Sequence, residues 1–292
     1  MRCRQIKTIL VVSRKIVKRH FRCEFLEGIL KILDQPEFSI IVPTYNDSQY
    51  ISMTLERILE QDFREFEVII VDGGSTDRTL ETIKNFYDHR IRICLTAGYH
   101  RYEMLNKGIS LAHGQYINFL FPGDFYLNVN ILSYLFEELK NHHFPSILFS
   151  PSLRRDVESD VKVEFRSLNL ETLKSGREPT SLPSCWIHTN TFKALGKFST
   201  QYLIRGGYEF FCRIQKVPHL HAVSRNRVLV DYVFHPCLRS NLFVHFIETF
   251  KIIYQYFGVK AALRWIFIQK DIHQILKITL QKIQKAFVGE IS

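Results

Sequence analysis

Three short polar segments carry the residue types that could bind and position a charged, hydrogen-bonding ligand. They read Pro-Thr-Tyr-Asn at 43–46, Asp-Gly-Gly-Ser-Thr-Asp at 72–77 and Pro-Gly-Asp at 122–124. Two of the segments contain carboxylates, which accept hydrogen bonds and can also hold a hard cation. Gly73 and Gly74 permit a tight turn, and the residues that follow them can cap a helix. We therefore look for chemistry in these segments first.

The polar segments follow apolar runs that have the length of buried β-strands. The pattern predicts strands over 38–42, 67–71, 90–95 and 116–121, and helices over 47–60, over 101–112 and up to about residue 141. Strands that alternate with helices through short links predict a parallel sheet with helices on both faces. Ligands bind such sheets at the carboxyl ends of the strands, near a reversal of strand order. The three polar segments lie at those ends.

The distribution of charge disfavours a nucleic acid partner. The formal net charge of the 292-residue chain is +10. Residues 1–35 hold nine Lys/Arg against three Asp/Glu, residues 239–292 hold eight against three, and residues 36–238 hold 22 against 23. A nucleic-acid-binding domain more often concentrates basic residues on the folded face that reads the ligand. The charge instead indicates a neutral folded centre with basic ends.

Cysteine usage and hydropathy indicate a location in the cytoplasm. The six cysteines are scattered without a C-x-x-C pair, which is typical of a reducing compartment and argues against a zinc site. No run approaches the roughly 18 to 20 apolar residues of a transmembrane helix, and the apolar stretch at 9–12 is too short for a signal peptide. The chain also lacks the G-x-G-x-x-G and P-loop patterns, which disfavours a dinucleotide oxidoreductase and a P-loop enzyme.

Four sequence segments together resemble the family 2 glycosyltransferases, which have the GT-A fold. Ser39–Asn46 and Val68–Asp77 are similar to the opening of that family, Tyr102–Ile109 resembles its Tyr-Asp-Ala-Met-Asn-Lys-Gly-Ile, and Ala112–Leu120 resembles the segment that leads into its metal-binding turn. The resemblance covers about residues 38–215 and depends on all four segments standing in order. It implies an α/β fold of the GT-A, Rossmann-like type, with a mostly parallel sheet.

The resemblance implies a nucleotide-sugar donor, with a UDP-sugar as the first expectation. Asp72 could accept a hydrogen bond from the imide N–H of uracil. The other interpretation of Asp72 is a turn residue that bonds its own backbone. Asn106 and Lys107 would stand beside the donor or form a solvated helix face, and Tyr102 would stack or simply pack. The donor-binding residues implied are Pro43, Thr44, Tyr45, Asp72, Tyr102, Asn106 and Lys107.

The acidic positions of the family are depleted in this chain. The metal-binding turn, which in one branch of the family reads Asn-Ser-Gly-Asp, is Phe-Pro-Gly-Asp here, so that Asp124 is the remaining ligand for a divalent cation, Mg²⁺ or Mn²⁺. One carboxylate can hold Mg²⁺ together with phosphate oxygens and water. Gly98 and Gly207 occupy two further positions that are acidic in the family, the second being that of the general base. Glu209 is then the catalytic base that the resemblance leaves.

One histidine falls in a segment that resembles the family. His188 lies in Cys185–Phe192, which is similar to a segment in which a histidine precedes the helix on the acceptor side. It would contact the acceptor or a phosphate, and the alternative is an ordinary buried histidine.

The two ends of the chain predict amphipathic helices. Apolar residues recur at three- and four-residue steps in 4–25 and again in 242–288, with a break at Gly258, and basic residues are interspersed. These helices would lie on an anionic membrane or pack on the central domain. The predicted organisation is a basic helix at 1–35, a glycosyltransferase domain at 36–238 and C-terminal helices at 239–292, located peripherally on the inner face of the membrane.

Two functions follow from the sequence. The first is an enzyme of the hexosyltransferase type, inverting by family resemblance, that moves a sugar from a nucleotide sugar to a glycan or lipid-linked acceptor in cell-surface polysaccharide or lipopolysaccharide assembly. The second is a catalytically inactive scaffold protein on the same fold at the membrane. The depleted carboxylates favour the scaffold, whereas the retained Asp124, Glu209 and base-slot segments favour the enzyme.

Overall fold

The computed structural model describes residues 35–155, 161–233 and 241–268. The chain divides into a unit of residues 1–36 and a unit of residues 37–292. The predicted N-terminal helix at 1–35 lies almost entirely outside the described residues.

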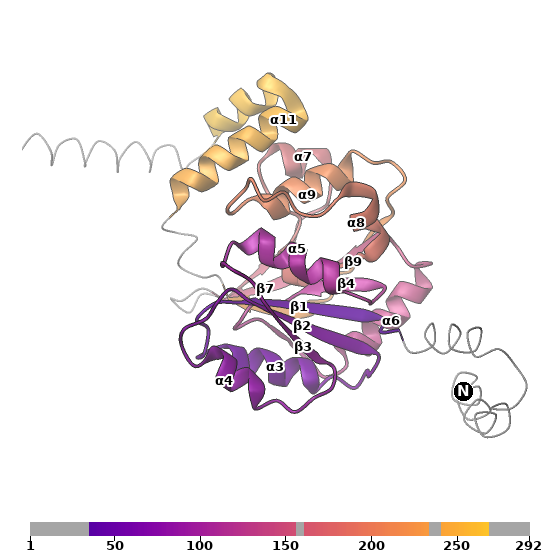
Figure 1. Cartoon of the computed structure of the whole chain (residues 1–292). Helices are drawn as coiled ribbons and strands as arrows, with labels where there is room; N and C mark the ends of the chain where they lie inside the picture. Colours follow the sequence, from indigo (N-terminus) through magenta and orange to yellow (C-terminus); the bar gives the residue numbers. More distant parts are fainter. Residues whose placement is uncertain (1–34, 156–160, 234–240, 269–292) are drawn as a thin grey trace, which may run out of the picture. The chain divides into compact units, whose positions relative to one another are not determined.

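A central seven-stranded sheet confirms the predicted fold class (Figure 1). Its strands are β1 (Phe38–Thr44), β2 (Phe66–Asp72), β3 (Ile91–Leu95), β4 (Tyr116–Phe119), β6 (Ile147–Phe149), β9 (Cys185–His188) and β10 (Ala222–Ser224). The order in space is β10-β6-β9-β4-β1-β2-β3, and only β9 runs antiparallel to its neighbours. Because the chain fills β2 and β3 on one side of β1 and then β4 on the other, the order reverses at β1.

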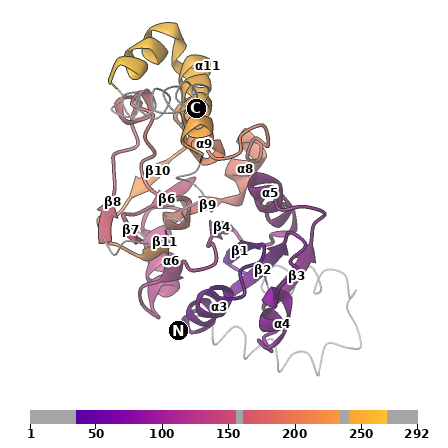
Figure 2. The same ribbon diagram turned by 90° about the vertical axis from the view of Figure 1, so that its left-hand side faces the viewer.

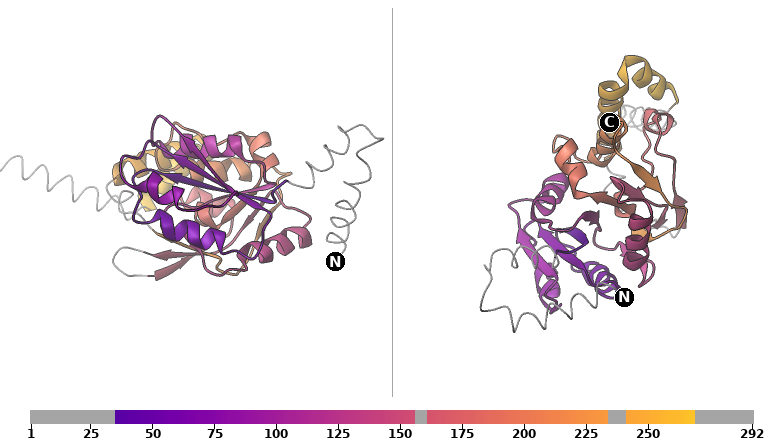
Figure 3. Two further views of the ribbon diagram at one scale, coloured as in Figure 1. Left: turned by 60° about the horizontal axis from the view of Figure 1, so that its bottom comes forward. Right: turned by 90° about the vertical axis from the view of Figure 1, so that its right-hand side faces the viewer.

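Helices cover both faces of this sheet, as the sequence predicts (Figure 1). One face packs against α3 (Ile51–Leu59), α4 (Thr79–Lys84) and α6 (Ile131–Asn141). The other packs against α5 (Arg101–Leu111), α8 (Thr189–Leu195) and α9 (Gly206–Gln215). Alternation along β1 divides the core, since Ile40 and Val42 join the first cluster and Ile41 joins the second. Both views of Figure 3 show the sheet between its helices.

A second, four-stranded sheet was not predicted from the sequence. It consists of β5 (Phe125–Tyr126), β7 (Ser152–Arg155), β8 (Val161–Glu164) and β11 (Val230–Val233), in the order β5-β11-β7-β8. These strands are short and come from distant parts of the chain, so no local sequence pattern predicts their pairing. The sheet forms a wall next to the turn that follows β4.

The C-terminal segment packs on the same core as α9. Helix α11 (Leu242–Ile268) consists of two helices joined at Gly258, whose φ of 83° interrupts the helix and confirms the predicted break. Ile252, Ile253, Ala262 and Trp265 are buried in the cluster shared with α5 and α9. α11 also contacts α7 (Leu170–Lys174), and Figures 1 and 2 show both on the α9 side of the sheet. Of the two alternatives, membrane binding or packing on the central domain, residues 242–268 therefore show packing, although one face of the helix remains exposed.

Candidate functional site

A cavity of about 1360 Å³ opens at the carboxyl ends of β1 and β4, next to the reversal of strand order. Its first half is walled by the segments after these strands and by the start of α5. Its second half is walled by the four-stranded sheet, by α7 with the segment after it, by the start of α9, and by α11. Such a position is the usual one for a ligand in an α/β sheet. The first part is lined by segments that the sequence resemblance assigns to a donor, so we call it the donor half and the other part the acceptor half.

The donor half has an aromatic and polar slot at the end of β1. Tyr45 stacks on Tyr99 with 4.3 Å between ring centroids, and both line the cavity together with Pro43 and Thr44. Asp47 accepts hydrogen bonds from the Thr44 hydroxyl (3.0 Å) and from the Tyr45 N–H (2.9 Å), which fixes the turn. The structure therefore places Pro43, Thr44 and Tyr45 where the sequence predicts a nucleobase slot.

The segment after β2 shapes this region without its carboxylate reaching the cavity. Asp72 is fully buried, and its carboxylate accepts hydrogen bonds from the N–H groups of Gly74 and Ser75 (both 2.9 Å) and from the Ser75 hydroxyl (2.5 Å). These contacts are those of a turn residue, the second interpretation of Asp72 that the sequence leaves open. The turn at 72–77 also holds the segment after β1, since the Asn46 amide oxygen accepts a hydrogen bond from the Thr76 N–H (2.8 Å).

Helix α5 places the predicted Tyr102, Asn106 and Lys107 in three different settings. Tyr102 lines the cavity but is 1% exposed, and its hydroxyl donates to the Ile204 carbonyl (2.5 Å) and accepts from the Gly207 N–H (3.0 Å). Asn106 bonds the backbone N–H and carbonyl of Phe198 (3.0 and 2.8 Å), and Lys107 is exposed away from the cavity. Asn106 therefore ties α5 to the backbone of Phe198. Lys107 is a solvated helix residue, and Tyr102 packs in the core.

Asp124 lines the cavity, but both of its carboxylate oxygens already accept hydrogen bonds. It is 1% exposed, and its two oxygens accept hydrogen bonds from the N–H groups of Phe121 and Val233 (both 3.0 Å). Burial raises the pKa of Asp124 to about 7, although these N–H groups and nearby Arg101 oppose the shift. Gly123, with φ of +98°, lets the turn close around the carboxylate. Asp124 thus joins the turn after β4 to β11 of the second sheet.

Arg101 is a cation that the sequence reasoning missed. It is the first residue of α5 and lines the cavity, and its guanidinium carbon lies 3.9 Å from the centroid of the Phe121 ring. Its position directly before the Tyr102 motif was the available signal. Arg101 therefore brings a positive charge to the donor half, next to the turn that ends at Asp124.

Glu209, the catalytic base that the sequence predicts, does not line the cavity. Its buried carboxylate accepts from Arg213 Nε (2.9 Å) and from the Tyr256 hydroxyl of α11 (2.5 Å). Arg213 is itself anchored to the carbonyl of Leu195 (2.7 Å). Gly207, at the position of the family's base, does line the cavity, and it offers no carboxylate.

His188, predicted to contact the acceptor or a phosphate, caps a helix in the structure. Its Nδ1 accepts a hydrogen bond from the Asn190 N–H (3.1 Å) at the start of α8, and its ring meets Tyr116 edge-on. Burial, followed by the charge of Lys193, lowers the pKa of His188. The residue lies outside the cavity lining.

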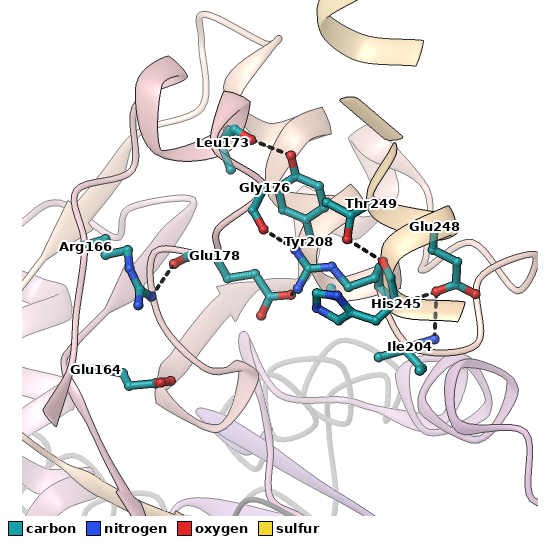
Figure 4. Close-up of polar contacts among 12 residues, drawn as sticks. Glu164, Arg166, Leu173, Gly176, Glu178, Ile204, Tyr208, His245, Glu248 and Thr249 are labelled. Atoms are coloured by element: carbon teal, nitrogen blue, oxygen red, sulfur yellow. Dashed lines mark hydrogen bonds and ion pairs between the residues drawn. The ribbon is translucent and has the colours of Figure 1, made fainter. Parts of the chain in front are cut away.

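A buried arginine organises the acceptor half. Arg205 donates to the carboxylate of Glu178 (2.9 Å) and to the carbonyl of Gly176 (2.6 Å), and its guanidinium stacks on Tyr208 at 4.4 Å. Figure 4 shows Glu178, Gly176 and Tyr208 together, with His245 of α11 beside them. Burial and then the charge of Arg205 lower the pKa of His245 to about 4. None of these residues was predicted, because they converge only in the tertiary structure.

Helix α11 completes the wall of the acceptor half. Phe257, Ala261 and Trp265 present apolar surface to the cavity, and Lys260 and Arg264 present basic groups. Glu248 of the same helix accepts hydrogen bonds from the N–H groups of residues 203, 204 and 205 (2.6, 3.0 and 2.9 Å), one of which is drawn in Figure 4. The helix thereby holds the segment that carries Arg205.

Comparison with known proteins places the sequence among glycosyltransferases. An uncharacterized glycosyltransferase of Haemophilus influenzae is 34% identical over 113 residues, which are 38% of this chain and 45% of that protein. The GalNAc(5)-diNAcBac-PP-undecaprenol beta-1,3-glucosyltransferase of Campylobacter jejuni is 30% identical over 143 residues, 47% of this chain and 44% of that protein. The chain thus spans less than half the length of either relative.

Solved structures share the fold at low sequence identity. Residues 1–349 of S. aureus TarS in complex with UDP match with a TM-score of 0.60 and 21% identity, over 74% of this chain and 64% of that one. The mannosyltransferase PcManGT of Pyrobaculum calidifontis in complex with GDP-Man and Mn²⁺ matches with a TM-score of 0.54 and 16% identity, over 85% and 80%. The model of the family described as "Glycosyl transferase family 2" matches residues 39–192, more than half of the chain. The chain belongs to glycosyl transferase family 2.

Proposed function

We propose that this chain transfers a sugar from a nucleotide-sugar donor to a hydroxyl group of a glycan or lipid-linked acceptor. The observation that carries the proposal is the two-part cavity at the carboxyl edge of the sheet, with an aromatic slot in one half and a basic, partly apolar wall in the other. In the reaction the acceptor oxygen bonds the anomeric carbon, the bond from that carbon to the diphosphate breaks, and a base takes the acceptor proton. A single displacement of this kind inverts the anomeric centre.

Relatives support this choice over an inactive scaffold. The two relatives bear glycosyltransferase names, and structures of the same fold hold UDP in TarS and GDP-Man in PcManGT. The Campylobacter protein is named for an undecaprenol-linked acceptor. We therefore propose a UDP-sugar as the first donor to test and a lipid-linked glycan as the acceptor class, in the assembly of a surface polysaccharide.

The residues of the cavity fit a resident metal ion poorly. The sequence predicts Mg²⁺ or Mn²⁺ on Asp124, but both oxygens of that carboxylate accept main-chain N–H groups. Phe121 stands where another ligand would be, and within the described ranges no three His, Cys, Asp or Glu side chains are arranged to hold a metal. Structural metal-ligand sets contain several such groups. A cation that enters with the donor would be held mainly by phosphate oxygens and water.

We propose Glu178 as the base that replaces Glu209. Glu178 lines the acceptor half, and Arg205 holds one of its oxygens at 2.9 Å. The other oxygen has no hydrogen-bond partner among the described residues, so it can receive an acceptor proton. Glu164, the neighbouring carboxylate, has both oxygens engaged by Arg154 (2.7 Å) and Tyr232 (2.5 Å).

A location on the inner face of a membrane is part of the proposal. Val259, Leu263, Phe267 and Ile268 are exposed on the second part of α11, next to Lys260 and Arg264 at the cavity wall. An apolar ridge beside basic residues suits the interface of an anionic bilayer. No helix among the described residues is both long enough and apolar enough to cross a bilayer.

The proposal is tested by binding and turnover together. Thermal shift with UDP-, GDP- and dTDP-sugars identifies the donor, and release of nucleoside diphosphate with a membrane lipid extract measures transfer. We expect one donor class to stabilise the protein and Glu178→Gln to lower turnover by about 100-fold or more, with donor binding unchanged. Binding of a donor without acceptor-dependent release in any extract would favour the scaffold function.

A further inference from the structure

The donor half must neutralise a diphosphate whose negative charge grows as the sugar leaves. Enzymes that transfer groups from phosphates do so with fixed cations or with metal ions held by carboxylates. In this cavity the carboxylate route is weak, because Asp124 is buried and bonded to two main-chain N–H groups. Some other positive group has to face the diphosphate.

Arg101 is the cation of the donor half. Its guanidinium lies over the Phe121 ring at 3.9 Å, so an aromatic side chain at the position of a missing metal ligand serves as a platform for a positive charge. The stack fixes the plane of the guanidinium and leaves its edge N–H groups available to a phosphate. Phe121 and Arg101 both line the cavity.

Arg101 differs from Arg205 and Arg154, two other arginines of the cavity wall, which are held in ion pairs. Arg205 is paired with Glu178 at 2.9 Å, and Arg154 with Glu164 at 2.7 Å. Among the ion pairs of the described residues none involves Arg101, and its buried Nε has no hydrogen-bond partner within the described part of the chain. A buried, unpaired N–H is costly, and a ligand that accepts from it removes that cost.

We propose that Arg101, held on Phe121, binds the donor diphosphate and takes the place of a carboxylate-held metal ion. This proposal rests on the proposed transfer from a nucleotide sugar. Planar arginine donors suit phosphate oxygens and form charge-assisted hydrogen bonds with them. Binding of the diphosphate is then independent of divalent cations, and the Phe-Pro-Gly-Asp turn is a functional replacement rather than a decayed one.

Isothermal titration calorimetry with UDP and uridine, each in EDTA and in Mn²⁺, tests the proposal on the full chain. The wild-type protein is expected to bind UDP in EDTA, with an affinity within about threefold of that in Mn²⁺. Arg101→Leu is expected to weaken UDP binding by roughly 10- to 100-fold and to leave uridine binding unchanged. Arg101→Lys retains the positive charge but not the paired N–H donors of the guanidinium, so its affinity for UDP is expected to lie between those of the wild type and Arg101→Leu.

Arg64→Leu serves as the matched control, because Arg64 is exposed and outside the cavity. Circular dichroism establishes that each variant is folded, and Phe121→Leu, which removes the platform but not the charge, replaces Arg101→Leu if that variant unfolds. UDP binding that requires Mn²⁺ and survives in Arg101→Leu overturns the proposal and leaves the transferase function standing. If UDP, GDP and dTDP all fail to bind under every condition, the donor proposal itself falls, and the role of Arg101 with it.

Discussion

At the scale of single residues, this site shows how a carboxylate can be present and yet unavailable. Asp72, Asp124 and Glu209 are all buried, and each accepts hydrogen bonds from groups of its own fold. A buried carboxylate requires such partners, since an unpaired charge in the interior is very costly. These three carboxylates therefore stabilise the fold, whereas Glu178 is the carboxylate that we propose as the base.

Glu209 and Glu178 form a matched pair for separating the two roles. Glu209→Gln removes the ion pair with Arg213, so we expect a loss on the order of 2 kcal/mol in unfolding free energy with turnover nearly unchanged. Glu178→Gln also removes an ion pair, with Arg205, so a similar loss of unfolding free energy is expected, but its turnover should fall far more than its folded fraction does. Urea unfolding and initial rates on both variants provide the comparison. A rate loss in Glu209→Gln that exceeds its loss in folded fraction would restore Glu209 as the base.

His245 predicts a specific dependence of stability on pH. Its folded-state pKa of about 4 lies below the ordinary value of 6.5, because burial and Arg205 oppose its protonation. Its contribution to stability is therefore complete above pH 6.5 and is lost as the pH falls toward 4. Between pH 7 and pH 4.5 the wild type should lose on the order of 2 kcal/mol more than His245→Gln. Urea unfolding across this range measures both slopes, and equal slopes would contradict the assignment.

At the scale of elements, α11 acts as a clamp on the acceptor half. Its Glu248 receives three consecutive main-chain N–H groups from the segment that ends in Arg205, and Arg205 in turn holds Glu178. Gly176, with φ of +74°, brings the segment after α7 close against Trp265 of the same helix. The helix therefore belongs to the wall of the acceptor half. The predicted domain boundary at 239 stays a division of the sequence, because residues 242–268 pack on the core of the central domain.

Truncation of the clamp should reduce both stability and activity. Glu248→Ala leaves three main-chain donors without their acceptor, and we expect a loss of roughly 3 kcal/mol in unfolding free energy. Turnover should fall as well, because Arg205 and Glu178 lose their support. Glu103→Ala is the control, since Glu103 is exposed on α5. Similar unfolding curves for the two variants would show that the three hydrogen bonds add little.

At the scale of the whole molecule, the exposed ridge of α11 and the basic ends bear on the proposed membrane location. Phe267 is 86% exposed and Leu263 is 48% exposed, which is unusual for large apolar side chains on a helix next to a cavity. The first 22 residues hold eight Lys/Arg and no Asp/Glu, and their structure lies outside the described ranges. Each basic residue near an anionic leaflet is worth on the order of 1 kcal/mol, and this attraction is screened by salt.

Sedimentation with liposomes measures the two contributions separately. The full chain should bind vesicles with anionic lipid, weakly at high salt and weakly to neutral vesicles. A chain that begins at Asp34 and the double variant Leu263→Glu, Phe267→Glu should each bind less, whereas Val163→Glu, at an exposed position of β8, should bind as the wild type does. Equal partitioning of all four proteins would place the ridge and the N-terminal segment against protein rather than lipid.

Local residue patterns are enough to predict the first four strands of the central sheet with the helices between them, the fold class, polar segments at the carboxyl edge of the sheet, and the break at Gly258. These features are encoded locally, since apolar periodicity, strand length and glycine each act within a few residues. The slot formed by Pro43, Thr44 and Tyr45 follows from them directly, because the end of β1 has to face that edge.

Long-range packing sets which polar side chains keep unpaired hydrogen-bonding groups. Glu209 and Arg213 are helix neighbours in the sequence, but only the packing of α11 against α9 turns Glu209 away from the cavity and gives it Tyr256. Likewise Arg205, Glu178 and His245 converge from three segments, and the second sheet pairs β5, β7, β8 and β11 across long stretches of chain. A side chain takes the partner that folding brings within hydrogen-bond distance, and that partner is set by long-range packing, which local residue patterns do not encode.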